Sequence, residues 1–387
     1  MADRTAIAKA AAAGLRAYGQ RVTKADGARA VIGFDGFIDS IIRVVDRRYD
    51  PVSFDAIPTI DVFGGRISAA AGKSANFEFV TTLQKLGGNG PIMANALAAG
   101  QVATTYMGAV GYPNPDPIFA ELVERAEAVV PLADAGATDA VEFDDGKLML
   151  GKYAHLLTLG ADTIRETIGV EAFTDVVGET DLLAMINWTM MPGTQSIWEL
   201  LADDVLPSLS GREKKLMVFF DLCDPAKRTI EDLRSALDVM KRVQAHAEVI
   251  LGMNLAESTY VAKALGLPEA KDAEAEIEQT AIAIREAMGI HATVVHPRSG
   301  AAACRIINGE STSATFAGPF VKQPKLSTGA GDNFNAGFCL GLLAGLSLEQ
   351  CLCTGVGTSG FYVRNAKSPT LTDLADFCDN LPAPEGG

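Results

Sequence analysis

The sequence predicts an α/β protein with a doubly wound, mainly parallel β-sheet and helices on both of its faces. Short apolar runs that fit buried strands occur at residues 182–187, 216–221 and 249–254, and polar residues follow them. A helical pattern at residues 230–247 separates the last two runs. Strands and helices that alternate in this way form parallel sheets, because each helix returns the chain to the edge where the next strand starts.

Length and composition fit an ordinary globular protein of one large or two smaller domains. The chain has 387 residues, of which 48% are hydrophobic and 21% charged. A net charge of −15 leaves no positive excess for nucleic-acid phosphates, so a nucleic-acid partner is not expected. The six cysteines lack metal-ligand spacing, and we expect reduced thiols in a cytoplasmic protein. Residues 3–22 predict a surface helix, since charges interrupt the apolar core that a signal peptide needs.

The first strand is expected at residues 30–39 and contains two acids near its end, Asp35 and Asp39. Ligands of parallel sheets gather at the carboxyl ends of strands, so both carboxylates are placed to bind hydroxyl groups. A capped turn into the next helix is the alternative. Residues 45–85 show no regular pattern, and Gly72-Lys73-Ser74 within them lacks the spacing of a phosphate-binding P-loop.

The middle of the chain continues the alternation of strands and helices. Gly88 and Asn89 belong to a glycine-rich turn that opens a helix. Further elements are expected in this order: a strand at 104–110, a helix at 118–128, a hairpin at 137–150 that turns at 144–146, a strand at 293–296 with a loop to Gly300, and a helix at 351–362.

A glycine turn that leads into a helix occupies residues 326–334, with the sequence Leu-Ser-Thr-Gly-Ala-Gly-Asp-Asn-Phe. Ser327 and Thr328 are expected to cap the helix. The N–H groups of residues 329–331 would then be free at the helix N-terminus, which attracts anions. Asp332 is unfavourable beside an anion unless it accepts the proton of a reacting hydroxyl.

The helix after this turn carries Gly337, Gly341 and Gly345 on one face. We expect this row to let the helix lie close against the sheet. A membrane-dimerisation motif would show the same spacing, but the uncharged run at 333–348 is shorter than the roughly 20 residues that a span needs. No membrane partner is therefore expected.

Asn254 and Glu257 form a second candidate site at the end of a predicted strand. A spacing of three residues on the first helical turn points both side chains to one side. Their oxygens suit Mg²⁺ held largely through water. The same pair also fits a helix cap, in which the two residues satisfy each other's backbone N–H groups.

Residues 328–338 resemble the C-terminal signature of the ribokinase-like (phosphofructokinase-B type) carbohydrate kinases. The resemblance extends over about residues 30–380 and implies the ribokinase-like fold, with a small β lid beside the sheet. It also implies a role for each part of the glycine turn. Asp332 would be the catalytic base, and Gly329, Ala330 and Gly331 would form the anion hole for the transferred phosphoryl group.

The other motifs of that family have counterparts in this chain. By resemblance, the sugar would be held by Asp35, Asp39, Gly88 and Asn89. The nucleotide would be held by Asn254, Gly300, Thr328, Gly329 and Gly331, and Mg²⁺ by Glu257 and Asn254 through water. Phe37 replaces an asparagine that is usual in the family, which leaves the substrate open. Leu326 replaces an aspartate associated with a monovalent-cation site, which makes potassium activation doubtful.

We therefore expect a cytoplasmic kinase that transfers the γ-phosphate of ATP to a hydroxyl of a small sugar, with Mg²⁺ as cofactor. The predicted organisation is an N-terminal helix in residues 1–29 and a kinase domain in residues 30–383, with 45–85 and 137–150 contributing to the lid. A homodimer through the lid is left open. Alternatives are a nucleoside kinase, an ADP-dependent sugar kinase of the same fold, and a sugar- or nucleotide-binding regulatory protein without turnover.

Overall fold

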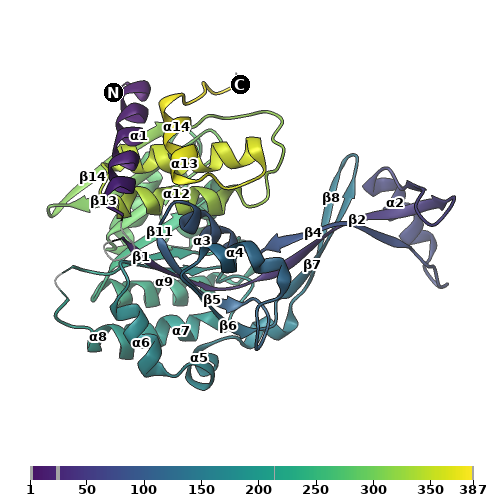
Figure 1. Ribbon diagram of the computed structural model, residues 1–387, viewed down its shortest axis with the longest axis horizontal. Coiled ribbons are helices and arrows are strands. Elements are labelled where there is room, and N and C mark those ends of the chain that lie inside the picture. Colours follow the sequence, from purple (N-terminus) through teal and green to yellow (C-terminus); the bar gives the residue numbers. More distant parts are fainter. Residues whose placement is uncertain (1–2, 23–26, 213, 386–387) are drawn as a thin grey trace.

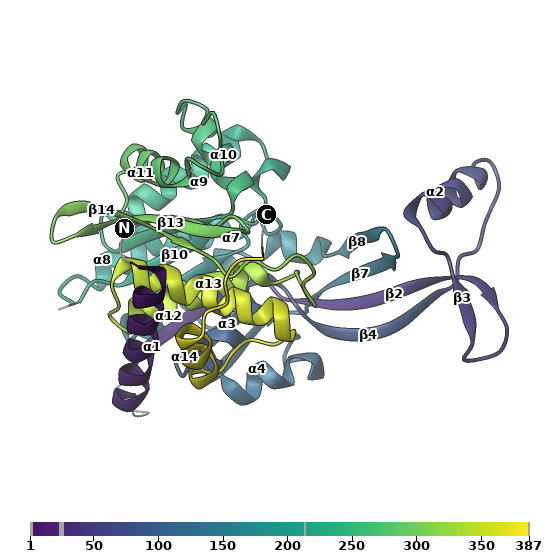
Figure 2. The same ribbon diagram turned by 90° about the horizontal axis from the view of Figure 1, so that it is seen from above.

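The computed structural model describes residues 3–22, 27–212 and 214–385. A large sheet between two layers of helices forms the body of the molecule, and a narrow ribbon of strands extends from one side of it (Figures 1 and 2). Both ends of the chain lie on the same side of the body (Figure 1). Within the described ranges, none of the helices combines the length and the apolar character needed to cross a membrane.

The large sheet confirms the predicted α/β class. Its strands are β1 (Arg29–Phe34), β5 (Ala103–Ala109), β6 (Ala128–Ala133), β9 (Leu182–Ile186), β10 (Met217–Asp221), β11 (Glu248–Met253), β12 (Ala292–Val295), β13 (Gly300–Ile307) and β14 (Glu310–Ala317). Their order across the sheet is β14-β13-β12-β11-β10-β9-β1-β5-β6. Neighbours from β6 to β12 are parallel, and only β13 and β14 at one edge pair antiparallel.

Helices cover both faces of this sheet. One face packs against α1 (Arg4–Arg21), α3 (Asn89–Ala99), α4 (Ala120–Arg125), α12 (Ala330–Leu343), α13 (Leu348–Asn365) and α14 (Leu371–Asp379). The other packs against α5 (Ala161–Thr167), α6 (Val170–Gly178), α7 (Thr194–Leu200), α9 (Ile230–Gln244), α10 (Leu255–Ala264) and α11 (Ile277–Met288). The short α8 (Leu206–Ser208) and four short helical turns, at Pro117–Phe119, Ala154–Thr158, Leu201–Val205 and Pro225–Lys227, complete the helical elements. Side chains alternate across each strand, so Val31 enters one core and Ile32 the other.

The ribbon beside the body is a second, smaller sheet. It consists of β2 (Phe37–Arg48), β3 (Phe54–Ala56), β4 (Phe79–Gly87), β7 (Gly136–Phe143) and β8 (Gly146–Lys152), with α2 (Ile60–Ala69) at its far end (Figure 2). The predicted hairpin is confirmed as β7 and β8. The prediction that residues 45–85 are irregular is wrong, because this range contains β3, α2 and most of β4. These elements are stabilised by a separate small core that includes Val44, Phe63 and Phe143. These apolar residues are too far apart in sequence to form a periodic pattern.

Two predicted elements differ in detail. The first strand does not run on to Asp39: β1 ends at Phe34, the chain turns at Asp35 and Gly36, and Asp39 lies in β2 of the small sheet. Two members of the predicted glycine row, Gly337 and Gly341, face α13 instead of the sheet, and the third, Gly345, lies beyond the end of α12. A Cβ at Gly337 would collide with Thr354 and Thr358 of α13, and one at Gly341 would lie 2.6 Å from Thr354 Oγ1. The row therefore brings two helices together.

Candidate active site

Polar residues follow five neighbouring parallel strands. They are Asp35 after β1, Asn187 after β9, the terminal Asp221 of β10, Asn254 after β11 and His296 after β12. The carboxyl ends of these strands meet at one edge of the sheet, as is usual for ligand sites in open α/β folds. Of these five residues, only Asp35 and Asn254 were predicted as site residues from the sequence. The acids that end β10 were a visible signal for Asp221, whereas a single asparagine and a single histidine gave none.

The glycine turn lies at this edge and leads into α12. Gly329 is the residue before the helix and has φ of 91°, in the left-handed region that glycine tolerates best. The predicted capping by Ser327 and Thr328 is wrong, because no side chain caps α12. The Thr328 carbonyl accepts a hydrogen bond from the Tyr362 hydroxyl (2.8 Å), and the Thr328 hydroxyl accepts one from Lys147 Nζ of β8 (2.6 Å). The turn is thus held by α13 and by the small sheet.

The anion-binding capacity of this turn is smaller than predicted. The Ala330 N–H already donates to the Ser327 carbonyl (3.2 Å), so this group is not free. Within the described part of the chain, the N–H groups of Gly329 and Gly331 donate to no protein acceptor. The first turn of a helix normally leaves such donors to solvent or to a ligand. Two backbone donors and the N-terminus of α12 therefore remain for an anion.

Asp332 lies in the first turn of α12 and is almost fully buried, with 6% of its surface exposed. Burial raises the pKa of this carboxyl to about 8, and a hydrogen bond from Asn89 opposes the rise. Asn89 Nδ2 donates to Asp332 Oδ1 (2.8 Å), whereas Oδ2 accepts no hydrogen bond from another described residue. One oxygen is therefore positioned by the protein, and the other is available to a ligand.

Asp35 is completely buried, and its carboxylate is already satisfied. It accepts hydrogen bonds from Asn89 N (2.9 Å), Gly90 N (2.7 Å) and Asn187 Nδ2 (2.8 Å). This geometry does not suit the predicted contact between Asp35 and a sugar. The carboxylate instead holds the start of α3, where Gly88 has φ of 94°. Sequence reasoning could not distinguish an acid that faces a ligand from one that faces backbone donors.

Asp39 occupies a different environment, on the small sheet. Asp39 lies in β2, where it is paired with Lys85 of β4 on one side and with Thr138 of β7 on the other. Burial raises the pKa of its carboxyl, and the charges of Lys85 and Lys147 together with a hydrogen bond from the Thr138 side chain oppose this rise. A Cβ at Gly87 would lie 2.5 Å from the Asp39 Cγ, so a glycine is required beside this carboxylate.

Tyr362 of α13 donates its hydroxyl proton to the Thr328 carbonyl of the glycine turn (2.8 Å). Burial, and then the negative charges of Asp332 and Asp39, raise the pKa of this hydroxyl. The hydroxyl that holds the glycine turn is therefore within electrostatic reach of an acid of this turn and of an acid of the small sheet.

Asn254 and Glu257 form the helix cap that the sequence allowed. Asn254 Oδ1 accepts from Glu257 N (3.0 Å), and Glu257 Oε2 accepts from Asn254 N (2.8 Å). Glu257 Oε1 accepts from Asp224 N (3.0 Å). Burial raises the pKa of the Glu257 carboxyl, and burial with the nearby charges of Glu257 and Asp332 raises that of Asp221. A group of buried acids thus surrounds the edge of the sheet.

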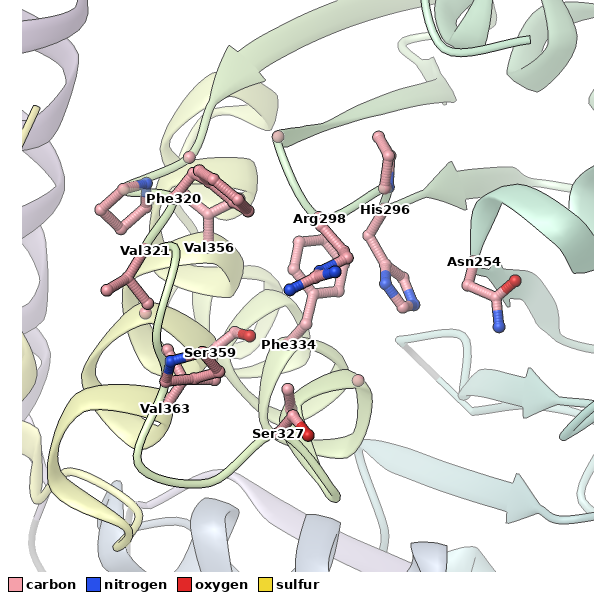
Figure 3. Close-up of a pocket in the computed structure, with 18 residues that line it drawn as sticks. Asn254, His296, Arg298, Phe320, Val321, Ser327, Phe334, Val356, Ser359 and Val363 are labelled. Carbon is pink, nitrogen blue, oxygen red and sulfur yellow. The ribbon is translucent and has the colours of Figure 1, made fainter. Parts of the chain in front are cut away.

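A cavity of about 360 Å³ opens beside the glycine turn (Figure 3). It is lined by Asn254, His296, Pro297, Arg298, Gly300, Gly318, Pro319, Phe320, Val321, Pro324, Ser327, Ala330, Gly331, Phe334, Val356, Ser359, Gly360 and Val363. His296 stacks on Phe334, with ring centroids 4.4 Å apart, and burial lowers its pKa to about 4. Arg298 lies over the Phe320 ring, 5.7 Å from its centroid. A partly aromatic pocket whose lining includes one cation, Arg298, is suited to a nucleotide.

The predicted nucleotide residues divide between this cavity and its surroundings. Asn254, Gly300 and Gly331 line it. Gly329 lies outside the lining but ends the same turn, and Thr328 faces the small sheet through its bond to Lys147. The turn therefore contacts the cavity through Gly331 and the small sheet through Thr328.

Comparisons with known proteins agree with this arrangement. A family model described as prokaryotic ketohexokinase matches residues 6–381. A ketohexokinase of Haloferax volcanii is 28% identical over 356 residues, which cover 92% of both chains. Arabidopsis thaliana ribokinase complexed with ribose and ATP has a TM-score of 0.60 at 16% identity, over 91% of this chain and 98% of that chain. A carbohydrate kinase from Agrobacterium tumefaciens has a TM-score of 0.59 at 16% identity, over 92% and 98%. The predicted ribokinase-like fold is confirmed.

Proposed function

The chain belongs to the prokaryotic ketohexokinase family of ATP-dependent sugar kinases, and we propose that it transfers the γ-phosphate of ATP to a hydroxyl of a ketohexose. One observation above all supports this proposal: the buried Asp332 lies at the N-terminus of α12, directly after Ala330 and Gly331, which line the nucleotide-sized cavity. A phosphoryl group delivered from the cavity to the glycine turn would meet an acceptor hydroxyl beside this carboxylate.

In the proposed reaction Asp332 is the base. Its free oxygen, Oδ2, accepts the proton of the acceptor hydroxyl as that oxygen bonds to the γ-phosphorus. The bond from this phosphorus to the bridging oxygen breaks, and the electron pair leaves with ADP. A pKa of about 8 keeps the carboxylate basic enough to take the proton and partly ionised near neutral pH.

The glycine turn would stabilise the charge that develops during transfer. The N–H groups of Gly329 and Gly331 are free to face the equatorial oxygens of the phosphoryl group, and the dipole of α12 adds to their field. Lys147 already reaches Thr328 of this turn from β8. We assign it the role of bringing positive charge to the transferred group when the small sheet covers the site as a lid.

The acidic residues fit a magnesium ion that is held mainly by water and phosphate. Among the described residues, no group of three or more His, Cys, Asp or Glu side chains is arranged as a protein cage for a metal. Both Glu257 oxygens already accept backbone N–H groups, which leaves their remaining lone pairs for water. Glu257 and Asn254 would hold the hydration shell of Mg²⁺, which supplies charge neutralisation to the nucleotide phosphates when bound.

Asp39 is the proposed ligand of the acceptor. Asp39 is buried, with 6% of its surface exposed. A buried carboxylate accepts hydrogen bonds from neighbouring hydroxyls of a sugar, and a sugar that lacks them leaves it unpaired. Asn89 was predicted to share this role, but its side chain is already engaged with Asp332. The acceptor contact therefore rests on the small sheet more than on the start of α3.

A second copy of the chain is the proposed partner of the small sheet. In β2, Ile41 pairs with Leu83 of β4 and with Ala140 of β7, and Ala140 pairs with Met149 of β8. These residues therefore share one face of the sheet, which also carries Asp39. Leu83 and Met149 are 57% and 47% exposed. An apolar row of this kind on a narrow sheet is typical of an interface. Light scattering should show a dimer that Leu83→Glu converts to a monomer; a wild-type monomer at assay concentration would contradict this.

The test of the proposed function is Asp332→Asn, which keeps the shape of the turn and the acceptor for Asn89 Nδ2. Phosphoryl transfer from ATP to fructose should fall by at least about a thousandfold, because the base is lost. Binding of ATP and of fructose, measured by calorimetry, should remain within a few-fold of wild type. Turnover close to wild type in the purified variant would refute the assignment of Asp332. A panel of sugars and nucleosides tests the acceptor class separately.

A further inference from the structure

The side chain of Asn89 connects the proposed base to a cysteine. Asn89 Nδ2 donates to Asp332 Oδ1 (2.8 Å), and Asn89 Oδ1 accepts from the Cys223 thiol (3.4 Å). The Asn89 backbone N–H donates to Asp35 Oδ2 (2.9 Å), which fixes where the side chain starts. A rotated amide would place its oxygen against a carboxylate and its NH₂ group against the thiol proton. The thiol therefore selects the amide orientation that donates to Asp332.

The loop after β10 places this thiol at some energetic cost. Cys223 and Asp224 have φ values of 56° and 58°, a left-handed conformation that costs residues other than glycine roughly 1 kcal/mol each. Two carboxylates hold the loop in this conformation. Asp221 Oδ1 accepts from Cys223 N (2.9 Å), and Glu257 Oε1 accepts from Asp224 N (3.0 Å). Glycine at either position would relieve the strain, but only a side chain at 223 can reach Asn89.

We propose that Cys223 is a positioning residue, which orients the Asn89 amide so that it donates to Asp332 and fixes the base for proton abstraction. The thiol takes part as a hydrogen-bond donor and not as a nucleophile. Burial, followed by the charges of Asp221 and Asp332, raises its pKa, so it stays protonated. The inference rests on the proposed role of Asp332 and changes the role of Asn89 from sugar ligand to support of the base.

Asn89 matters because burial and several nearby acids oppose ionisation of Asp332. These acids are Asp35 after β1, Asp221 at the end of β10 and Glu257 of α10; the Cys223 thiol and the Tyr362 hydroxyl also lie within their field. Lys147, which donates to the glycine turn, and the N-terminus of α12 favour ionisation. Burial and the charges of Asp35 and Glu257 raise the pKa of Asp332, and the Asn89 hydrogen bond lowers it. Loss of that bond should raise this pKa further.

The test is the pH dependence of kcat in four proteins: wild type, Cys223→Ala, Cys223→Ser and Asn89→Ala. The rate should rise with pH as Asp332 ionises. A hydrogen bond to a charged group is worth enough that Asn89→Ala should move this rise upward by roughly one to two pH units. Cys223→Ala should move it in the same direction by less, and Cys223→Ser should restore it, because a hydroxyl also donates to Asn89 Oδ1.

The controls separate positioning from packing and from sugar binding. Cys339→Ala removes another buried thiol, from the middle of α12, and should leave the pH profile unchanged. If the pH profile moves in neither Asn89→Ala nor Cys223→Ala while KM for fructose rises, the proposed positioning of Asp332 by Cys223 through Asn89 is wrong, and Asn89 is a sugar ligand. If Cys223→Ser behaves as Cys223→Ala does, donation by residue 223 is refuted. An active Asp332→Asn variant would instead refute the proposed function itself.

Discussion

Asp332→Asn is expected to make the protein more stable while it abolishes turnover. The native pKa of Asp332 is about 8, against 3.8 for an ordinary aspartate. Folding at pH 7 must therefore protonate this carboxyl. Each pKa unit corresponds to about 1.4 kcal/mol, so the native state loses up to about 4 kcal/mol at that pH. An asparagine is neutral, keeps the bond from Asn89 and avoids this loss. We expect Asp332→Asn to raise the free energy of unfolding by roughly 2–4 kcal/mol at pH 7.

The pH dependence gives the prediction its sign. Between about pH 4 and pH 8 the native state binds the Asp332 proton and the unfolded state does not, so wild-type stability falls as pH rises. The stability of Asp332→Asn lacks this dependence on pH, because the asparagine side chain does not titrate. The difference between the two proteins should therefore grow by about 1.4 kcal/mol per pH unit from pH 4 and become constant above pH 8. Other buried acids such as Asp35 titrate in both proteins, so their contributions to the difference in unfolding free energy largely cancel.

Urea unfolding at pH 5, 6, 7, 8 and 9 measures this difference directly. Asp162→Asn is the matched control, because the Asp162 side chain is 87% exposed; its unfolding midpoints should follow the wild type at every pH. A difference between wild type and Asp332→Asn that does not change with pH would show that Asp332 ionises normally in the native protein. The reasoning about its burial would then be refuted.

Three further variants test the remaining assignments. Glu257→Gln should raise the Mg²⁺ concentration for half-maximal rate, because a carboxylate that holds the metal's water shell is lost; a magnesium titration measures this. Asp39→Ala should weaken sugar binding by roughly ten- to a hundredfold in calorimetry and leave nucleotide affinity without sugar unchanged. Lys147→Met should lower kcat by roughly tenfold or more in steady-state assays, because positive charge near the transferred phosphoryl group is removed.

Each of these variants has an outcome that would contradict its assignment. An unchanged magnesium titration would leave Glu257 as a helix cap alone. Loss of nucleotide binding with intact sugar binding in Asp39→Ala would mean that the two halves of the site are exchanged. An unchanged kcat in Lys147→Met would show that its bond to Thr328 only orders the turn. Lys147→Arg, which keeps the charge, is the matched control for the last variant.

The fold could be predicted because its signals are local. Buried parallel strands such as β9 and β10 are continuous apolar runs, and the glycine turn before α12 combines sharp turning residues with a helix start. The small sheet could not be read from the sequence in the same way. Its core joins Val44 of β2, Phe63 of α2 and Phe143 of β7, which are far apart in sequence and meet only in the folded chain.

The sequence selects candidate site residues but does not predict their contacts. Asp35 and Asp39 look equivalent in sequence, yet one is saturated by backbone donors and the other faces Lys85 across the small sheet. Asn89 was expected to hold a sugar, and its side chain donates a hydrogen bond to Asp332 that the sequence did not predict. Which donor meets which acceptor depends on distances across the fold that no local pattern records. For the same reason Cys223 had no signal in the sequence.

The close contact of α12 and α13 has a consequence for how enzymes of this kind diversify. The proposed base, Asp332, lies in the first turn of α12, while Val356, Ser359 and Val363 of α13 line the cavity proposed for the nucleotide. Because Gly337 leaves no room between the two helices, we expect the base and the wall of this cavity to keep a constant spacing. The proposed acceptor ligand, Asp39, lies on β2 of the separate small sheet. We therefore expect new acceptor sugars to be accommodated by changes in that sheet, without realigning the phosphate donor with the base.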